Sequence, residues 1–355
     1  LRKEKKHFLK KEIRILKNIQ NSRKPIKSFY LEINSKKKLK SWISAARLET
    51  IPLSTSGIII GSFYSFFIQK FDIVIFILAL LTAISYQVLS NFANDYGDGI
   101  LGTDDNRIGP KRSIASGEIL PSELKKAILI NIFISVSLSY FLIKYSFGTN
   151  YYLLLIFLIL SIFSVVAAIK YTMGKSPYGY KGFGDFFVFI FFGLISVMGS
   201  SFLYTLKLDF ILLPIAISLG FLCVGVLNLN NIRDIENDKK MKKKTIPTRI
   251  GFKLSKYYHN LLIILPFLLT IFWSYQFSIY DYAIYESDNV TENFEISYNY
   301  FLIILALIPF IFHLIKVHFA KAPDEFRPLL KQLALSVFLY SILISIFLIN
   351  ESKFF

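Results

Sequence analysis

Long apolar stretches recur along the chain and are separated by short polar segments. A helix needs roughly 20 mostly apolar residues to cross the hydrocarbon core of a bilayer, so stretches of this kind predict membrane-spanning helices. The pattern predicts nine of them, at about residues 50–68, 72–94, 123–143, 150–169, 183–204, 209–231, 257–276, 299–315 and 331–350. The expected fold class is all-α, a polytopic membrane protein with nine transmembrane helices.

The composition supports this expectation. Hydrophobic residues make up 54% of the 355 residues and the mean hydropathy is +0.50, which excludes an ordinary soluble domain. Cys223 is the only cysteine and lies inside an apolar stretch. A disulfide within the chain and a cysteine metal site are therefore excluded, and we expect a small buried packing residue.

The charge is strongly positive, with a formal net value of +17. If the predicted helices alternate in direction, all but four of the 41 Lys and Arg residues fall on one side; the four are Lys70, Lys144, Lys207 and Lys353. The positive-inside tendency makes that side cytoplasmic, together with the N-terminus. The lipid bilayer accounts for the charge, and no nucleic-acid partner is expected. The predicted location is the plasma (inner) membrane.

The first 40 residues form a basic, Lys-rich segment. Two interpretations stay open: an amphipathic helix lying on anionic lipid, or a disordered basic tail. Neither gives the segment catalytic chemistry. The predicted domains are thus a basic cytoplasmic segment, 1–40, and a transmembrane domain, 41–355.

Two polar clusters end apolar stretches on the predicted cytoplasmic side, SNFANDYGD after the second and NLNNIRDIEND at the sixth. The polar residues are Asn91, Asp95 and Asp98 in the first cluster and Asn230, Asp234 and Asp238 in the second. Spacings of three and four residues place each set on one helix face. Because the clusters match and lie four helices apart, they suggest an internal duplication.

Ionisable groups at a membrane edge must pair, bind a cation or open to water. One interpretation is structural, in which nearby cations only neutralise the acids. The candidate cations are Arg107, Lys111, Arg112, Arg233, Lys239, Lys240, Lys242, Lys243 and Lys244. The other is a lipid diphosphate site, because Mg²⁺ prefers a few carboxylates together with phosphate oxygens, while Lys and Arg neutralise the remaining phosphate charge.

The spacings N-x-x-x-D-x-x-D and N-x-x-x-D-x-x-x-D resemble the UbiA superfamily of intramembrane aromatic prenyltransferases. The resemblance covers about residues 40–350. The segments SNFANDYGDGILGTDDNRIGPKRSIASGEI, YGYKGFGDFFVFIFFG and VLNLNNIRDIENDKKMKKKTIPTRIG are similar to the branch that acts on 1,4-dihydroxy-2-naphthoate in menaquinone biosynthesis. It implies nine helices around a central cavity, Mg²⁺ as cofactor, a polyprenyl diphosphate and an aromatic acceptor as partners, and transfer with release of diphosphate and CO₂ to give demethylmenaquinol.

The resemblance also implies residue roles. Metal ligands would be Asp95, Asp98, Asp234 and Asp238, with Asn91 and Asn230 supporting them; Lys111 and Arg112 would bind the diphosphate, and Arg47 and Arg233 the substrate. The family's usual Arg-Pro is Arg47-Leu48 in this chain, so the role of Arg47 rests on the arginine alone. A further ligand, or a partner for Arg112, would come from Asp104 or Asp105.

The Gly- and Tyr-rich loop from Tyr171 to Asp185 lies on the same predicted side as both clusters. It is either a lid, contributing Lys175 or Asp185 to the acceptor, or an ordinary turn-rich connection. Other functions also stay open at this point. These are a different acceptor (4-hydroxybenzoate, homogentisate, haem or chlorophyllide), an ion-coupled secondary transporter, and a nonenzymatic lipid-binding scaffold.

Overall fold

The computed structural model describes residues 38–103, 112–287 and 299–352, and all described secondary structure is helical. Residues 38–46 are helical and lead into η1 (Leu48–Thr50). The other elements are α3 (Ile51–Phe67), α4 (Ile73–Leu101), α5 (Pro121–Phe147), α6 (Tyr151–Lys170), η2 (Tyr178–Lys181), α7 (Gly184–Val188), the π-helix η3 (Phe189–Gly199), α8 (Ser200–Thr205), η4 (Phe210–Leu212), α9 (Leu213–Arg233), α10 (Ile235–Lys240), α11 (Ile246–Ser287), α12 (Tyr300–Phe319), η5 (Pro323–Glu325) and α13 (Phe326–Glu351).

Nine helical stretches in the described residues are long and apolar enough to span a membrane, which confirms the predicted fold class and helix number. Several of the predicted stretches extend further than expected, among them the first two and the seventh, which begins at Ile246. The first spanning stretch begins at Lys38 and contains a kink at Arg47, and the second continues to Leu101, so that the first polar cluster lies within a helix. The division at residue 40 is untested and stays a prediction.

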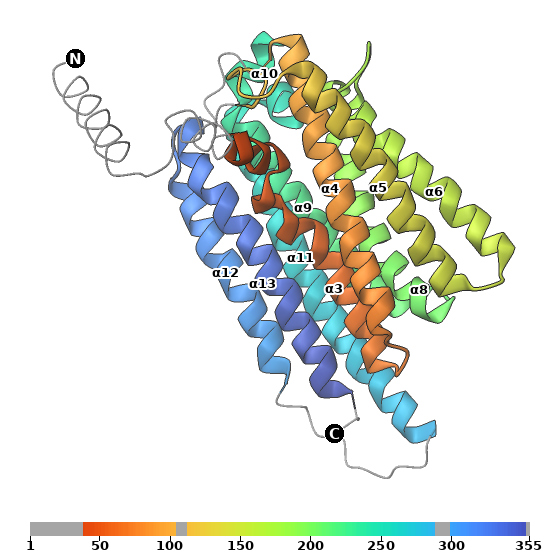
Figure 1. Ribbon diagram of the computed structural model, residues 1–355. Helices are drawn as coiled ribbons and strands as arrows, with labels where there is room; N and C mark the ends of the chain where they lie inside the picture. The colour runs from red at the N-terminus through yellow and green to blue at the C-terminus, as the bar shows by residue number, and fades with distance from the viewer. Residues whose placement is uncertain (1–37, 104–111, 288–298, 353–355) are drawn as a thin grey trace, which may run out of the picture.

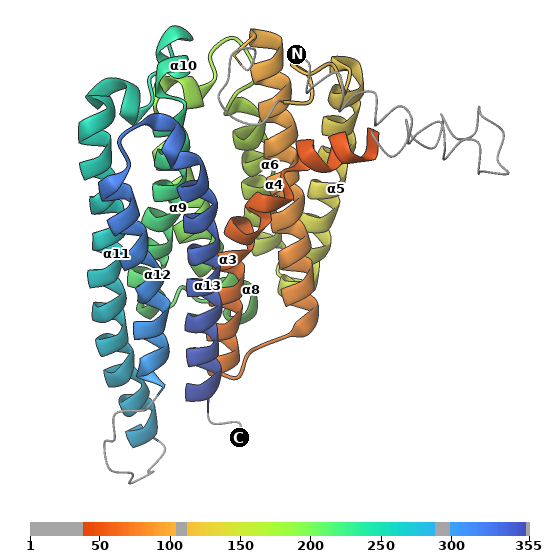
Figure 2. The same cartoon turned by 90° about the vertical axis from the view of Figure 1, so that its left-hand side faces the viewer.

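The spanning helices form one elongated bundle (Figures 1 and 2). Helices α4, α5 and α6 pack together, α11, α12 and α13 form a second group with α9, and α3 contacts both α4 and α13. The short helix α10 and the connection between α4 and α5 lie at the same end of the bundle (Figure 1). This end carries the polar clusters.

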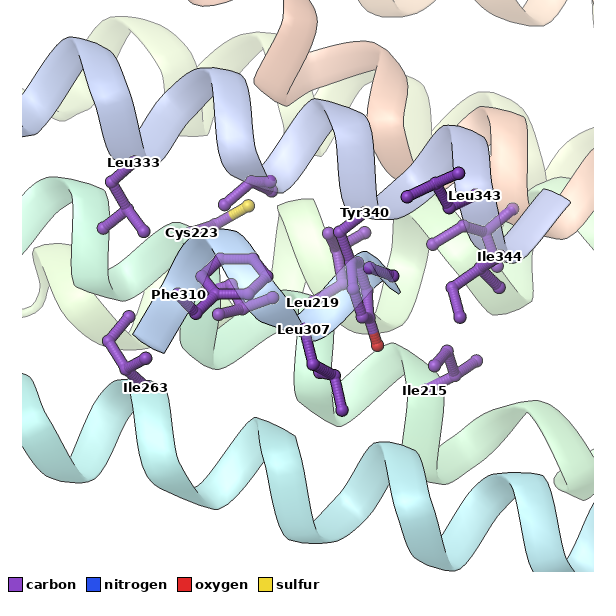
Figure 3. Close-up of a cluster of buried hydrophobic side chains, with 14 of the residues drawn as sticks. Ile215, Leu219, Cys223, Ile263, Leu307, Phe310, Leu333, Tyr340, Leu343 and Ile344 are labelled. Atoms are coloured by element: carbon purple, nitrogen blue, oxygen red, sulfur yellow. The ribbon is translucent and has the colours of Figure 1, made fainter. Parts of the chain in front are cut away.

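The largest apolar core lies where α9, α11, α12 and α13 meet, and Figure 3 shows its side chains interdigitating around Phe310 and Tyr340. Cys223 is a free thiol within this core and is 3% exposed, as expected of a packing residue. Large apolar side chains also cover the outside of the bundle: Phe133 is 74% exposed and Phe319 is 70% exposed. An exterior of this kind is stable in contact with lipid and unfavourable in water.

Candidate functional site

The first polar cluster lies on the last three turns of α4. Asn91, Asp95 and Asp98 are 2%, 1% and 8% exposed, so each is withdrawn from solvent. The helix continues to Leu101 and ends at Gly102, which has a positive φ of 69° and caps the helix by donating its N–H to the Asp98 carbonyl. Because buried carboxylates are costly without partners, the contacts of these side chains decide what the site can do.

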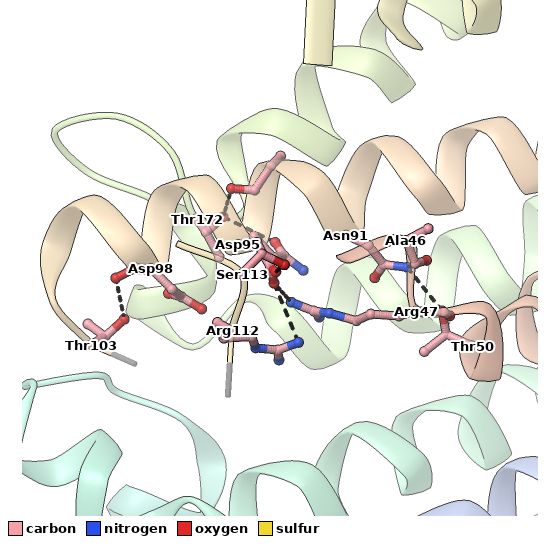
Figure 4. Close-up of polar contacts among 12 residues, drawn as sticks. Ala46, Arg47, Thr50, Asn91, Asp95, Asp98, Thr103, Arg112, Ser113 and Thr172 are labelled. Atoms are coloured by element: carbon pink, nitrogen blue, oxygen red, sulfur yellow. Dashed lines mark hydrogen bonds and ion pairs between the residues drawn. The ribbon is translucent and has the colours of Figure 1, made fainter. Parts of the chain in front are cut away.

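Asp95 is held between two arginines (Figure 4). Nη2 of Arg47 makes a short ion pair with Oδ1 of Asp95, and Nη1 of Arg112 lies 3.4 Å from the same oxygen. Ser113 donates its hydroxyl to Oδ2 at 3.3 Å. Arg47 has left-handed backbone angles (φ 49°, ψ 59°) at the kink before η1, a conformation that costs a non-glycine residue energy. The kink turns its guanidinium toward α4.

Asn91 supports this arrangement through residues on either side of Arg47. Its Nδ2 donates to the carbonyl of Ala46 at 2.8 Å and to Oγ1 of Thr50 at 3.1 Å, which brackets Arg47 on both sides. Gln87 also donates to Thr50, at 2.9 Å. Asn91 therefore positions the turn that carries Arg47, the partner of Asp95. Its support of a metal site stays a prediction.

The second cluster departs from the predicted continuous helix. Helix α9 ends at Arg233, Asp234 (φ −94°, ψ 10°) is the hinge, and Asp238 lies on the separate helix α10. The expectation that all three residues share one face of a single helix is therefore wrong. The N–H of Asp238 still donates to the carbonyl of Asp234 at 2.8 Å, so the local spacing of one helical turn is retained across the break.

Local contacts hold the second cluster. Arg233 donates from Nε and Nη2 to the two oxygens of Asp234 at 2.8 and 2.7 Å, a bidentate arrangement. Nη2 also donates to Oδ1 of Asn230 at 2.7 Å. Asp234, Asp238 and Arg233 are 6%, 5% and 5% exposed. Arg233 thus ties the first two members of the cluster together.

Lys243 joins the two clusters. Its Nζ lies 3.2 Å from Oδ1 of Asp98 and 3.9 Å from Oδ1 of Asp238. Tyr180 donates its hydroxyl to the same oxygen of Asp98 at 2.6 Å. Both clusters therefore lie at one end of the bundle and face each other, as the sequence predicted.

The loop between α6 and α7, residues 171–183, docks on α4, which carries the first cluster, and on the segment after α10. Thr172 donates its hydroxyl to the Ala93 carbonyl at 3.1 Å, and the N–H of Lys244 donates to the Tyr180 carbonyl at 2.9 Å. Gly97 makes the close approach possible, because a Cβ there would lie 2.7 Å from the Thr172 carbonyl oxygen. Burial and the nearby Tyr178 raise the pKa of the Tyr171 phenol, so the group stays protonated. The loop lies where a lid would lie. Movement of the loop over the site stays a prediction.

The remaining predicted residues fall in different places. Lys111, Asp104, Asp105 and Arg107 lie outside the described residues. Lys175 is exposed on the loop, and in the described residues no contact joins its side chain to the four carboxylates. Asp185 is half-buried at the start of α7 and accepts a hydrogen bond from Tyr258 at 2.8 Å. The roles expected of Lys175 and Asp185 toward an acceptor stay predictions.

The donor set suits a hard cation that completes its shell with other ligands. In the described part of the chain no three His, Cys, Asp or Glu side chains converge on one point as a complete protein-only metal site. Two pairs of buried carboxylates nevertheless face one region, and Mg²⁺ usually binds through one or two carboxylates plus waters and phosphate oxygens. The Asp98–Asp238 pair already shares a cation, the Lys243 ammonium.

Comparison with known proteins identifies the family. The model of the "UbiA prenyltransferase family" matches residues 48–285. A relative from Haemophilus influenzae, named 1,4-dihydroxy-2-naphthoate octaprenyltransferase, is 39% identical over 313 residues, covering 87% of this chain and 96% of the relative. The chain belongs to the UbiA prenyltransferase family.

Solved structures of family members share the fold. A UbiA homolog from Aeropyrum pernix, in its apo form, has a TM-score of 0.61 and 14% identity, covering 84% of this chain and 98% of that one. A homolog from Archaeoglobus fulgidus bound to DMAPP and Mg²⁺ has a TM-score of 0.54 and 16% identity, covering 87% and 99%. At these identities the likeness shows the fold alone.

Family membership makes this chain a prenyltransferase, a transferase, and leaves the transporter and scaffold interpretations without support. The placement of the carboxylates agrees, because they lie together at one end of the bundle, whereas transporter sites lie near the bilayer midplane. The sequence pattern does not single out Tyr180, Ser113, Thr172 or Gln87. The only signal for Tyr180 was the tyrosine-rich composition of its loop.

Proposed function

We propose that this enzyme transfers a polyprenyl group from a polyprenyl diphosphate to 1,4-dihydroxy-2-naphthoate, with Mg²⁺ as cofactor, releasing diphosphate and CO₂ and forming demethylmenaquinol. The observation that carries the proposal is the meeting of two buried aspartate clusters at one end of a membrane bundle, joined by Lys243. The name of the Haemophilus influenzae relative supports the acceptor and an octaprenyl donor.

The charge of the site supports the metal requirement. In the described residues, four buried carboxylates face four cations, Arg47, Arg112, Arg233 and Lys243. Among these residues the charges balance, so a strongly negative diphosphate would need positive charge from outside this set to enter a poorly hydrated site. Mg²⁺, when bound, would supply that charge and stabilise the negative charge that develops on the leaving oxygen.

The protein's own cations would bind and orient the diphosphate. Nε of Arg47 is buried and has no hydrogen-bond partner among the described residues. A buried donor without a partner is costly, and a phosphate oxygen would satisfy it. This orphaned donor supports the substrate-binding role that the sequence predicted for Arg47.

The transfer requires one bond to form and two to break. The allylic C–O bond breaks with its electron pair moving to the diphosphate oxygen, and a ring carbon of the acceptor forms a bond to the allylic carbon. The acceptor carboxylate then leaves as CO₂, returning its electron pair to the ring. Water would capture the allylic cation, so the docked loop 171–183 serves the reaction by covering the site.

The test is the mass of the product. The purified full chain is incubated with octaprenyl diphosphate, Mg²⁺ and, in separate reactions, 1,4-dihydroxy-2-naphthoate, 4-hydroxybenzoate or homogentisate. We expect product only with the naphthoate, at the mass of the prenylated ring less CO₂. Product with another acceptor and none with the naphthoate would show that the assigned acceptor is wrong.

We further propose that the site faces the cytoplasm, with the enzyme in the plasma (inner) membrane. The sequence supports this orientation through the distribution of Lys and Arg. Cys223 is buried, so single cysteines introduced at exposed positions report topology. Thr149→Cys, between α5 and α6, should react with an impermeant maleimide from outside intact spheroplasts, whereas Ala115→Cys, between α4 and α5, should react only after permeabilisation. The reverse pattern would invert the assignment.

A further inference from the structure

Lys243 occupies an unusual position for a lysine. Its side chain is 16% exposed, and its ammonium lies between Asp98 and Asp238, at 3.2 and 3.9 Å. The ammonium also lies 4.4 Å from the centroid of the Tyr180 ring, a cation–π arrangement. An ammonium withdrawn from water needs such partners, because its own desolvation is costly. The site therefore holds a positive charge between the two clusters.

The backbone after α10 determines this placement. The N–H of Lys243 donates to the Asp238 carbonyl at 2.9 Å and that of Lys242 donates to the Lys239 carbonyl at 3.1 Å, the two hydrogen bonds of a Schellman cap. The cap requires the left-handed conformation at Lys242, where φ is 55°. The turn thus returns the chain over α10 and brings the Lys243 side chain next to the Asp238 carboxylate.

Tyr180 fixes the ammonium from the other side. Its hydroxyl donates to the oxygen of Asp98 that Lys243 also contacts, and its carbonyl accepts the N–H of Lys244. One residue of the loop 171–183 is therefore bonded to α4 and to the segment after α10. The loop and both clusters are linked through the position of the Lys243 ammonium.

We propose that Lys243 is a resident counter-ion that substitutes for the metal between Asp98 and Asp238 and is displaced when Mg²⁺ binds; this rests on the proposed Mg²⁺-dependent function. A monovalent ammonium held by two carboxylates competes directly with a divalent cation for the same oxygens. The displaced ammonium remains within the site, where a diphosphate would accept its hydrogen bonds. Lys243 thus offsets the negative charge of Asp98 and Asp238 in the metal-free site and prepares the site for its substrate.

The experiment follows thermal unfolding of the full chain in detergent, first in chelator and then across a titration with Mg²⁺ alone. Compared with the wild type, Lys243→Met should unfold at a lower temperature in chelator, because Asp98 and Asp238 lose their shared cation. It should also respond to Mg²⁺ at a concentration roughly tenfold lower, because the competing charge is gone. Lys244→Met is the matched control, since it removes the same charge from an exposed side chain and keeps its backbone hydrogen bond to Tyr180.

The alternatives give different results. If Lys243 contacted only the diphosphate, or formed a fixed ion pair that Mg²⁺ does not displace, the Mg²⁺ midpoint of Lys243→Met would equal or exceed that of the wild type, and the proposal would be overturned. The absence of any Mg²⁺ response in both proteins would overturn it as well. Should Lys243→Met fail to fold, Tyr180→Phe provides the second variant, with the same direction of change and a smaller size. Failure of the naphthoate assay leaves these measurements unaffected, so the two proposals fail separately.

Discussion

Asp95 in the first cluster is held by residues from distant parts of the chain, whereas Asp234 in the second is held by its immediate neighbour. Arg47 is 48 residues from Asp95, and Lys243 is 145 residues from Asp98. Arg233 is adjacent to Asp234 and three residues from Asn230. The first cluster therefore becomes complete only when the kinked first helix, the loop after α6 and the segment after α10 are all in place. In the described part of the chain, Arg233, at the end of α9, donates side-chain hydrogen bonds to both Asp234 and Asn230.

The largest effects are expected when one aspartate of each cluster is replaced, and the resulting losses of stability should differ between the two clusters. Asp95→Asn and Asp234→Asn should each lower kcat/KM by about 100-fold or more, because each removes charge from the site that binds the developing negative charge. Asp95→Asn should also destabilise the fold by roughly 3–5 kcal/mol, since Arg47 and Arg112 lose a shared buried partner. Asp234→Asn should cost less, because Arg233 retains Asn230. Product formation measures the loss of activity, and thermal unfolding measures the loss of stability. If Asp95→Asn and Asp234→Asn lost the same stability, the contrast between long-range and local support of the two clusters would be wrong.

The same contrast explains what the sequence could predict. The nine spans found in the described residues follow from apolar length alone, and the alternation of their directions places both clusters at one end. The bidentate contact of Arg233 is also accessible, because the two residues are neighbours. The break at Asp234 could not be predicted from the sequence. A spacing of four residues is the same on one continuous helix and across a hinge that keeps the hydrogen bond from Asp238 to Asp234.

The long-range contacts could not be predicted in this way. Nine cations lie near the two clusters in the sequence and Arg47 lies much earlier, and the backbone conformation decides which of these ten reach the carboxylates. Arg47 reaches Asp95 because it adopts left-handed angles at a kink inside an otherwise apolar stretch. Lys243 reaches Asp98 because Lys242 does the same after α10. A hydropathy pattern carries no information on either turn.

Two arginine replacements test the roles of the clusters in binding. Arg47→Lys should raise the KM for polyprenyl diphosphate roughly tenfold, because a lysine cannot contact Asp95 and present a second donor such as Nε at once. Arg233 already uses Nε and Nη2 within its own cluster. Arg233→Lys should therefore lower the unfolding temperature, and it should raise the KM for polyprenyl diphosphate less than Arg47→Lys does. A larger KM effect in Arg233→Lys than in Arg47→Lys would reverse the assignment.

A smaller effect is expected where the loop meets the first cluster. Gly97→Ala places a Cβ 2.7 Å from the Thr172 carbonyl oxygen and 2.8 Å from its carbon, both backbone atoms that cannot move cheaply. We expect a loss of about 1–3 kcal/mol in stability and faster tryptic cleavage at the exposed Lys175. Gly199→Ala is the control, since its nearest neighbour would be 3.7 Å away. If both variants are cleaved at the wild-type rate, Gly97 does not control docking of the loop.

The smallest expected effect concerns the turn that aims Lys243. Lys242 adopts φ 55°, a conformation that glycine adopts more easily than any residue with a Cβ. Lys242→Gly removes this strain and keeps the Schellman hydrogen bonds, so we expect stability to rise by about 1 kcal/mol or less. The Mg²⁺ midpoint should stay at the wild-type value, because the ammonium of Lys243 keeps its place. A drop in the unfolding temperature together with a lower Mg²⁺ midpoint would show instead that glycine loosens the turn and lets Lys243 leave its place between the clusters.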